Sequence, residues 1–447
     1  MWPIIAARDT LIVIGMLLVV VMTSARLIQP AWWQSRALRG ATFAAFGAML
    51  AGIALLAVGR GLGRLPLVHF GAAVAYVGVI VLAPAAIVLP FAAVLDRLLI
   101  RFLARASLEP APALALPPAG AEQDGNLTRR AFIRAGSASL PAMAALTSAS
   151  GLVAPRLAPR LPIIPMVYED LHPDLDGLRI LQLSDLHLGA CAGLDDLAAG
   201  LERAMAQRPD LIVLTGDLAD DPSLIPGALD LVHRAGARYG ALASLGNHEY
   251  LHGIEVTRPR YEASSIPLLV SKGTSLTIGR ARLFVGGSDD PVHMGGDIAS
   301  MLRPSIAAAA SHAPRAADFR LLLCHRPEGH GPAAEQGFDL TLSGHTHGGQ
   351  LGLFGRSLLE KLRPGTGWWG TYARRRPSLR AAQRTMLASS PSRLYTTSGF
   401  GHWFPFRLGC PTEMPIVVLE RARTRARVAR GGARGVSTAT NSTVTSG

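Results

Sequence analysis

Cysteine and lysine are scarce in this 447-residue sequence. Its three cysteines, Cys191, Cys324 and Cys410, are too few for a disulfide framework and too far apart for a CxxC zinc site. Lys272 and Lys361 are the only lysines, so arginine carries nearly all of the formal net charge of +13. No aromatic-interleaved basic motif accompanies this charge, so we expect no nucleic-acid partner. Anionic membrane lipids are the expected partner instead.

Charged residues are also rare in the first hundred positions, which are mostly apolar. Three apolar stretches, 10–29, 41–58 and 67–94, are close to or longer than the ~20 residues that a helix needs to cross a bilayer. A single stretch of this kind is also typical of a buried helix in a soluble protein, but three in series favour a membrane region. We therefore predict a transmembrane helical region with three spans over residues 1–106.

Basic residues in the loops predict the orientation of this region. The first loop and the segment after the third apolar stretch contain more basic residues than the other flanking segments. Their arginines are Arg26, Arg36, Arg39, Arg97, Arg101 and Arg105. Because positive charge is retained on the cytoplasmic side, the first loop and the chain from about residue 106 are expected in the cytoplasm.

Residues 107–153 are predicted to be a linker with an internal export signal. Arg129 and Arg130 precede Phe132 and a mildly apolar run that ends near residue 153, which resembles a twin-arginine signal. The alternative is a short basic linker ahead of a surface helix. If the signal operates, the twin-arginine translocase is a partner and the apolar run is a possible fourth span. The domain that follows is then extracytoplasmic, in a multi-pass protein of the bacterial cell membrane.

Residues 154–422 are predicted to form a folded α/β domain, and residues 423–447 a disordered basic and polar tail. Apolar runs that are typical of buried strands occur at 178–183, 211–215, 241–245 and 319–324. Each run is followed by carboxylate, amide or imidazole side chains. In open α/β folds, sites gather at the carboxyl ends of strands, so these loops are expected to converge.

A further apolar run, 338–342, leads to a pair of histidines two residues apart, His345 and His347. Gly344 precedes His345 and two glycines follow His347, which permits a tight turn. In an extended segment, residues i and i+2 project from one face, so both rings are predicted to address one point. For an isolated pair, an exposed polar turn is an equal alternative to a metal site.

Five motifs in order make this sequence resemble the calcineurin-like metallophosphoesterases. They are Asp185-x-His187, Gly216-Asp217-x-x-Asp220, Gly246-Asn247-His248-Glu249, His325 and Gly344-His345-x-His347. The resemblance covers about residues 178–420 and implies an α/β domain of two packed β-sheets flanked by helices, with a dinuclear metal centre. The stretches 343–350, 398–401 and 407–411 are similar to the membrane-linked bacterial branch, which includes UDP-diacylglucosamine hydrolases and twin-arginine-exported members.

The same resemblance implies roles for ten residues. One metal ion is expected on Asp185, His187, Asp217 and His347, and a second on Asp217, Asn247, His325 and His345. Asp217 would bridge the two ions, whose oxygen and imidazole ligands suit Mn, Fe or Zn. His248 is the expected catalytic residue, which steadies the transition state or protonates the leaving group. Asp220 and Glu249 are expected to support the ligands from outside.

Other polar residues have less specific interpretations. Four histidines are interpreted as surface or packing residues, although any of them could line the substrate pocket: His252, His293, His330 and His402. The segment 352–393 contains Trp368, Trp369, Tyr372 and Arg374 to Arg376. It either contacts lipid headgroups or a substrate phosphate, or it is a solvated, partly flexible loop.

Together these features predict a membrane-anchored phosphoesterase that uses two divalent metal ions to activate a hydroxide. The expected substrate has a phosphodiester or pyrophosphate bond, and lipid-linked and nucleotide-linked phosphoesters are the candidates. One alternative is a UDP-2,3-diacylglucosamine-type lipid pyrophosphatase on the cytoplasmic face, which conflicts with the predicted export of the domain. Another is a non-catalytic metal-binding membrane protein.

Overall fold

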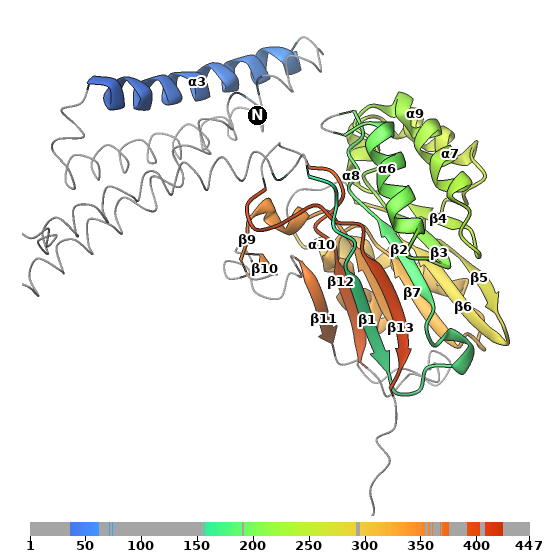
Figure 1. The fold of residues 1–447 in the computed structure, drawn as a ribbon. Coiled ribbons are helices and arrows are strands. Elements are labelled where there is room, and N and C mark those ends of the chain that lie inside the picture. The colour runs from blue at the N-terminus through green and yellow to red at the C-terminus, as the bar shows by residue number, and fades with distance from the viewer. Residues whose placement is uncertain are drawn as a thin grey trace, which may run out of the picture.

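A computed structural model describes one helix near the N-terminus and most of the predicted α/β domain (Figure 1). The described residues are 36–61, 71, 74, 154, 157–189, 192–291, 296–353, 356–357, 360, 367, 369–374, 391–402 and 407–422.

The helix near the N-terminus, α3 (Arg36–Gly61), contains the second predicted span. Across the described ranges, no helix combines the length and the apolar character that crossing a bilayer requires. The prediction of three spans is therefore not confirmed. The first and third stretches lie outside the described residues, except for positions 71 and 74, and so do the linker 107–153 and the tail 423–447.

The first sheet of the α/β domain has five strands in the order β1-β13-β2-β3-β4. Their bounds are β1 (Ile163–Tyr168), β13 (Ile416–Arg421), β2 (Arg179–Leu183), β3 (Leu211–Thr215) and β4 (Ala241–Ser244). Strands β2, β3 and β4 run parallel, while β13 pairs antiparallel with β2. The carboxyl ends of three neighbouring strands therefore lie at one edge of this sheet.

The second sheet has six strands in the order β11-β12-β8-β7-β6-β5. Their bounds are β11 (Gly370–Arg374), β12 (Ser392–Thr396), β8 (Leu340–Ser343), β7 (Phe319–Leu323), β6 (Ala281–Gly287) and β5 (Lys272–Ile278). The four central strands are parallel, and β11 and β5 are antiparallel edges. A short ribbon of β9 (Gly352–Leu353) and β10 (Arg356–Ser357) follows β8.

The two sheets pack face to face around a shared apolar core. Ile180, Val213 and Val417 of the first sheet belong to the same buried cluster as Leu321 and Leu342 of the second. Such runs of large apolar residues are expected of strands that are covered on both faces.

Helices cover the outer face of each sheet. The helices of the α/β domain are α6 (Leu194–Met205), α7 (Ile225–Ala235), α8 (Asn247–Leu251), α9 (Ile254–Glu262), α10 (Ile298–Ser311) and α11 (His330–Glu335). Apolar residues of α6 and α7 pack against the first sheet, and those of α10 pack against the second. Figure 1 shows α6, α7 and α9 grouped on one side of the strands. The predicted arrangement of two packed sheets flanked by helices is confirmed.

Candidate metal centre

The ten predicted site residues lie directly after the carboxyl ends of five strands, on loops or in the short helix α8. Asp185 and His187 follow β2, Asp217 and Asp220 follow β3, and His248 lies in α8, directly after β4. His325 follows β7, and the histidine pair follows β8. Both sheets therefore contribute ligands at the same end of the sandwich.

The backbone at this centre adopts conformations that are unusual for residues with side chains. Five candidate ligands have positive φ angles: Asp185 (54°), His187 (47°), Asp217 (55°), His345 (68°) and His347 (49°). Left-handed backbone at residues other than glycine costs free energy and is concentrated at functional sites. The fold thus holds these side chains in positions that ordinary loop geometry would not give.

Neighbouring glycines let the loops come close enough to share a site. A Cβ atom on Gly344 would lie 2.0 Å from Asp185 Oδ2, and one on Gly246 would lie 2.2 Å from Asp217 Oδ1. Any larger residue would therefore displace a candidate ligand.

The first cluster of candidate ligands consists of Asp185, His187 and His347. His187 Nε2 lies 3.1 Å from His347 Nε2, which in turn lies 3.4 Å from Asp185 Oδ1. Two ring nitrogens this close leave room for a cation between them, because metal–nitrogen bonds of about 2.0–2.1 Å bring neighbouring ligands to such separations.

The second cluster consists of Asp217, His325 and His345. His325 Nε2 lies 3.0 Å from Asp217 Oδ2 and 3.3 Å from His345 Nδ1. Asp217 Oδ2 is also 3.8 Å from His187 Nε2 of the first cluster. Asp217 therefore lies between the two clusters, where a bridging carboxylate would be.

The histidine pair does not behave as an extended strand would. His345 belongs to the second cluster and His347 to the first, so the prediction that both rings address one point is wrong. The reason is the positive φ at both residues, which turns the chain tightly after β8. The two rings instead address two neighbouring points.

Two further observations indicate that the residues present fit a pair of metal ions. Asn247 Oδ1 is buried and, among the described atoms, has no hydrogen-bond partner. An orphaned buried acceptor costs about 1–3 kcal/mol unless something binds it. In addition, burial would lower the pKa of His325, but the charges of Asp217 and Asp185 raise it to about 10. A site that holds a proton so strongly also attracts a cation.

Backbone carbonyls and carboxylates outside the clusters orient the ligands. Thr215 O lies 2.8 Å from His325 Nδ1, so this nitrogen carries the proton and Nε2 faces the centre. Glu249 is fully buried and accepts hydrogen bonds from the N–H groups of Asp217, Leu218 and Gly246. It joins the loops after β3 and β4 and so fixes the position of Asp217.

Two buried arginines next to the histidine pair received no role in the sequence analysis. Arg326 binds Asp290 through Nε at 2.7 Å and Nη2 at 3.1 Å, and its Nη1 lies 3.1 Å from His345 Nε2. Arg407 Nη2 lies 3.2 Å from His347 Nδ1 and donates to the carbonyl of Ser398. Arg326 directly follows the motif residue His325, and Arg407 begins the stretch 407–411; these positions were the only sequence signal for them.

His248 lies beside the first cluster and pairs with Asp220. Its Nδ1 is 2.6 Å from Asp220 Oδ1, and its ring is 4.4 Å from that of His187. Burial lowers the pKa of His248, but the charge of Asp217 and the hydrogen bond with Asp220 raise it to about 9. The ring is therefore held as a proton donor next to the candidate ligands.

The four remaining histidines have different environments. His330 and His402 are buried, so the surface interpretation is wrong for them, while packing fits. His252 Nε2 lies 3.1 Å from Asp220 Oδ1, which makes it part of the polar surroundings of the centre. His293 lies outside the described residues.

The described parts of the segment 352–393 are ordered by specific contacts. Residues 370–374 form the edge strand β11, which pairs with β12, so the interpretation of this part as a solvated loop is wrong. Trp369 Nε1 donates to Glu413 Oε1 at 3.2 Å, and Tyr372 OH donates to Glu360 Oε2 at 3.0 Å. Trp368 and residues 375–390 lie outside the described residues.

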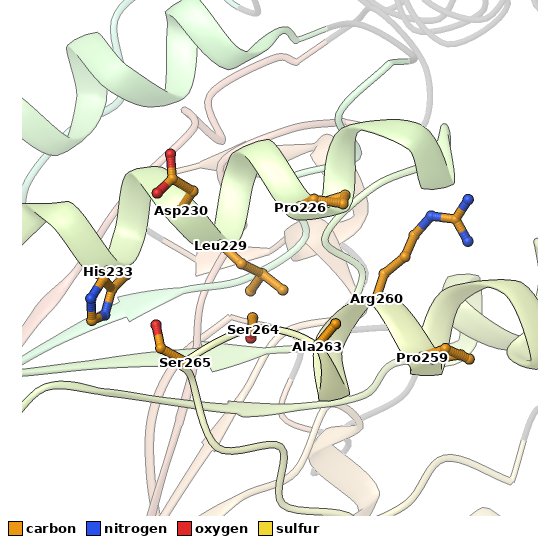
Figure 2. A pocket seen from close by; sticks show the side chains of 9 residues that line it. All are labelled: Pro226, Leu229, Asp230, His233, Pro259, Arg260, Ala263, Ser264 and Ser265. Carbon is orange, nitrogen blue, oxygen red and sulfur yellow. The ribbon is translucent and has the colours of Figure 1, made fainter.

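A groove of about 400 Å³ lies between α7 and α9, away from these loops (Figure 2). Figure 2 shows Leu229, His233 and Arg260 among the side chains that line it. It contains none of the candidate metal ligands, so it is not part of the centre.

Residues 178–349 match the sequence model of the family described as calcineurin-like phosphoesterases. This part of the chain is therefore similar to the calcineurin-like phosphoesterases. The matched range includes all ten predicted site residues. The finer prediction, a branch related to UDP-diacylglucosamine hydrolases, is not confirmed.

The curated relatives of this part of the chain are moderately similar to it. An uncharacterized metallophosphoesterase of Campylobacter jejuni is 30% identical over 246 residues, which cover 54% of this chain and 59% of that protein. The chain thus spans less than two thirds of that relative's length. Phosphodiesterase YaeI of Escherichia coli is 27% identical over 251 residues, which cover 54% of this chain and 82% of that protein. Among solved structures, a 5'-nucleotidase precursor from Thermus thermophilus is 15% identical with a TM-score of 0.34, over 50% of this chain and 49% of that one.

Proposed function

We propose that this protein is a phosphoester hydrolase that uses two divalent metal ions and acts on phosphodiester or pyrophosphate bonds. The observation that carries the proposal is the position of Asp217, within 3.0 Å of His325 Nε2 and 3.8 Å of His187 Nε2, between two ligand clusters. The Escherichia coli relative named as a phosphodiesterase supports the bond type.

The residues divide the work between binding and proton transfer. When bound, two divalent ions polarise phosphoryl oxygens and lower the pKa of water. Asp217 keeps the two clusters together, and Asn247 contributes a neutral oxygen. His248 fixes its Nδ1 on Asp220, which leaves Nε2 to donate a hydrogen bond or a proton to the leaving oxygen. The pKa of His248, raised against the effect of burial to about 9 by the charge of Asp217 and the hydrogen bond with Asp220, keeps a proton on this ring at neutral pH.

The test uses the full-length protein, purified in detergent, stripped with a chelator and reloaded with Mn²⁺. We expect Mn²⁺-dependent hydrolysis of bis(p-nitrophenyl) phosphate by the wild type. A His233→Ala variant is a matched control and should behave like the wild type, because His233 is exposed in the groove of Figure 2. A panel that adds a phosphomonoester and a UDP-linked lipid pyrophosphate ranks the substrate classes. Absence of metal-dependent turnover on the whole panel would contradict the enzyme proposal.

Membrane anchoring and export of the domain are the topological part of the proposal. They are supported by the three apolar stretches, by the loop arginines, and by Arg129 and Arg130 in a twin-arginine-like setting. A receptor that reads the planar five-donor fork of arginine should discriminate against lysine.

Protease accessibility in intact spheroplasts tests this topology. Protease should digest the wild-type domain and spare a variant in which both Arg129 and Arg130 are replaced by lysine. A wild-type domain that stays protected until the membrane is broken would place the site in the cytoplasm, and a UDP-linked lipid would then become the leading substrate.

A further inference from the structure

Three histidine nitrogens surround one carboxylate oxygen beside the candidate metal centre. Asp220 Oδ1 lies 2.6 Å from His248 Nδ1, 3.1 Å from His187 Nδ1 and 3.1 Å from His252 Nε2. An ionised carboxylate only accepts hydrogen bonds, so each of these nitrogens must carry a proton.

These three hydrogen bonds determine which ring nitrogen of each histidine carries the proton and which nitrogen remains free. A proton on His187 Nδ1 leaves Nε2 as the nitrogen that faces the first cluster. A proton on His248 Nδ1 leaves Nε2 as the free nitrogen of that ring, whose side chain is 23% exposed. Asp220 therefore orients one candidate ligand and the candidate proton donor at once.

His252 holds this carboxylate from the solvent side. It caps the C-terminus of α8, directly after Leu251, and its N–H donates to His248 O at 2.9 Å. The rings of His248 and His252 consequently lie on the same side of one helical turn, 5.6 Å apart. The His252 side chain is 20% exposed. Besides the ring contact with His248, this side chain makes the hydrogen bond to Asp220.

We infer that His252 is a positioning residue for the hydrolysis proposed above. Without its Nε2–H, the Asp220 carboxylate has two donors in place of three and can rotate away from His248. The position of the His248 ring then becomes less well defined, although the metal ligands stay in place. This inference rests on the proposed function, and it assigns a role that none of the five sequence motifs includes.

Two amide substitutions test the geometry of the hydrogen bond. The Gln side chain places an N–H group near the position of His Nε2, whereas the shorter Asn side chain does not reach it. His252→Ala and His252→Asn should both lower kcat about 10- to 100-fold with little change in KM. His252→Gln should recover most of the rate. Equal rates for the Gln and Asn variants would overturn the inference. They would indicate a role in packing, which does not depend on whether the amide N–H reaches Asp220.

A double-mutant cycle and metal analysis distinguish this positioning role from an effect that does not depend on His248 and from a role as a metal ligand. In a His248→Ala background, His252→Ala should cause no further loss of kcat, because the residue acts through His248. Additive losses would overturn the inference. Metal content per chain should be the same in the wild type and in His252→Ala. A lower content would instead make Asp220, His248 and His252 a cation site of their own.

A spectroscopic readout keeps the inference testable if the wild type proves inactive on every substrate, which would contradict the proposed function alone. In metal-loaded protein with ¹⁵N-labelled histidine, His248 Nδ1–H should give a downfield proton resonance, because its hydrogen bond to Asp220 is 2.6 Å long. This resonance should broaden or disappear in His252→Ala and persist in His252→Gln. An unchanged resonance in His252→Ala would overturn the inference.

Discussion

The two ligand clusters on either side of Asp217 are similar in composition but differ in how their charge is balanced. Behind the second cluster, Arg326 is held by both oxygens of Asp290, and both side chains are buried. Behind the first cluster, Arg407 donates to backbone carbonyls, and no carboxylate lies within ion-pair distance of it in the described part of the chain. The acidic partner of the first cluster is Asp220, on the opposite side.

This difference places the carboxylate that is shared with His248 at the first cluster. Asp220 is shared between His187, a candidate ligand, and His248, the candidate proton donor. At the second cluster, Asp290 instead binds Arg326, whose Nη1 lies 3.1 Å from His345 Nε2. We therefore expect changes around the first cluster to affect chemistry, and changes around the second to affect stability and metal retention.

Asp217→Asn should have the largest effect, because it removes the one carboxylate that both clusters use. Loss of that charge raises the repulsion between two bound cations. We expect the variant to lose several kcal/mol of transition-state stabilisation, which corresponds to a kcat/KM at least about a thousandfold lower. Elemental analysis should show loss of metal as well. A variant with two tightly bound metals and normal turnover would remove Asp217 from the bridging position.

His248→Ala should lower kcat by roughly 10²–10⁴, the contribution typical of a general acid or base. Metal content should remain that of the wild type, because Asp185, His187 and His347 are unchanged. Elemental analysis of the kinetically characterised sample checks both statements. Metal loss in this variant would make His248 a ligand.

Arg326→Met should destabilise the domain more than Arg407→Met. The first change leaves Asp290 buried without its partner, which costs about 3–5 kcal/mol. The second leaves backbone carbonyls without donors, which costs about 1–3 kcal/mol. Urea unfolding of both variants measures the difference.

A second substitution sharpens this comparison. Adding Asp290→Asn to Arg326→Met should recover stability, because the uncompensated charge is then absent. No recovery would show that the pair is not what balances the second cluster.

Much of the fold was predictable because its central strands are buried on both faces. The run Leu211–Thr215 is read directly as a strand and is β3 with the same bounds. The edge strand Gly370–Arg374 has no apolar run, since one side of an edge strand faces solvent and only pairing with β12 defines it. Its sequence therefore resembled that of a loop.

The site was predictable at the level of residue types and not of geometry. The motifs identified Asp185 and His345, but nothing in a local pattern indicates a positive φ at residues other than glycine. The Arg326–Asp290 pair joins positions 36 residues apart, and the hydrogen bond of His252 crosses 32 residues to Asp220. Such pairings arise from the tertiary fold, so no periodicity or spacing could reveal them.

The most direct test of the account is to locate bound metal by anomalous diffraction from crystals of the Mn²⁺-loaded protein. We predict two peaks, one bound by Asp185, His187 and His347 and one by Asn247, His325 and His345, with Asp217 bonded to both. A single peak, or two peaks of which only one contacts Asp217, would contradict the dinuclear centre on which the proposed chemistry depends.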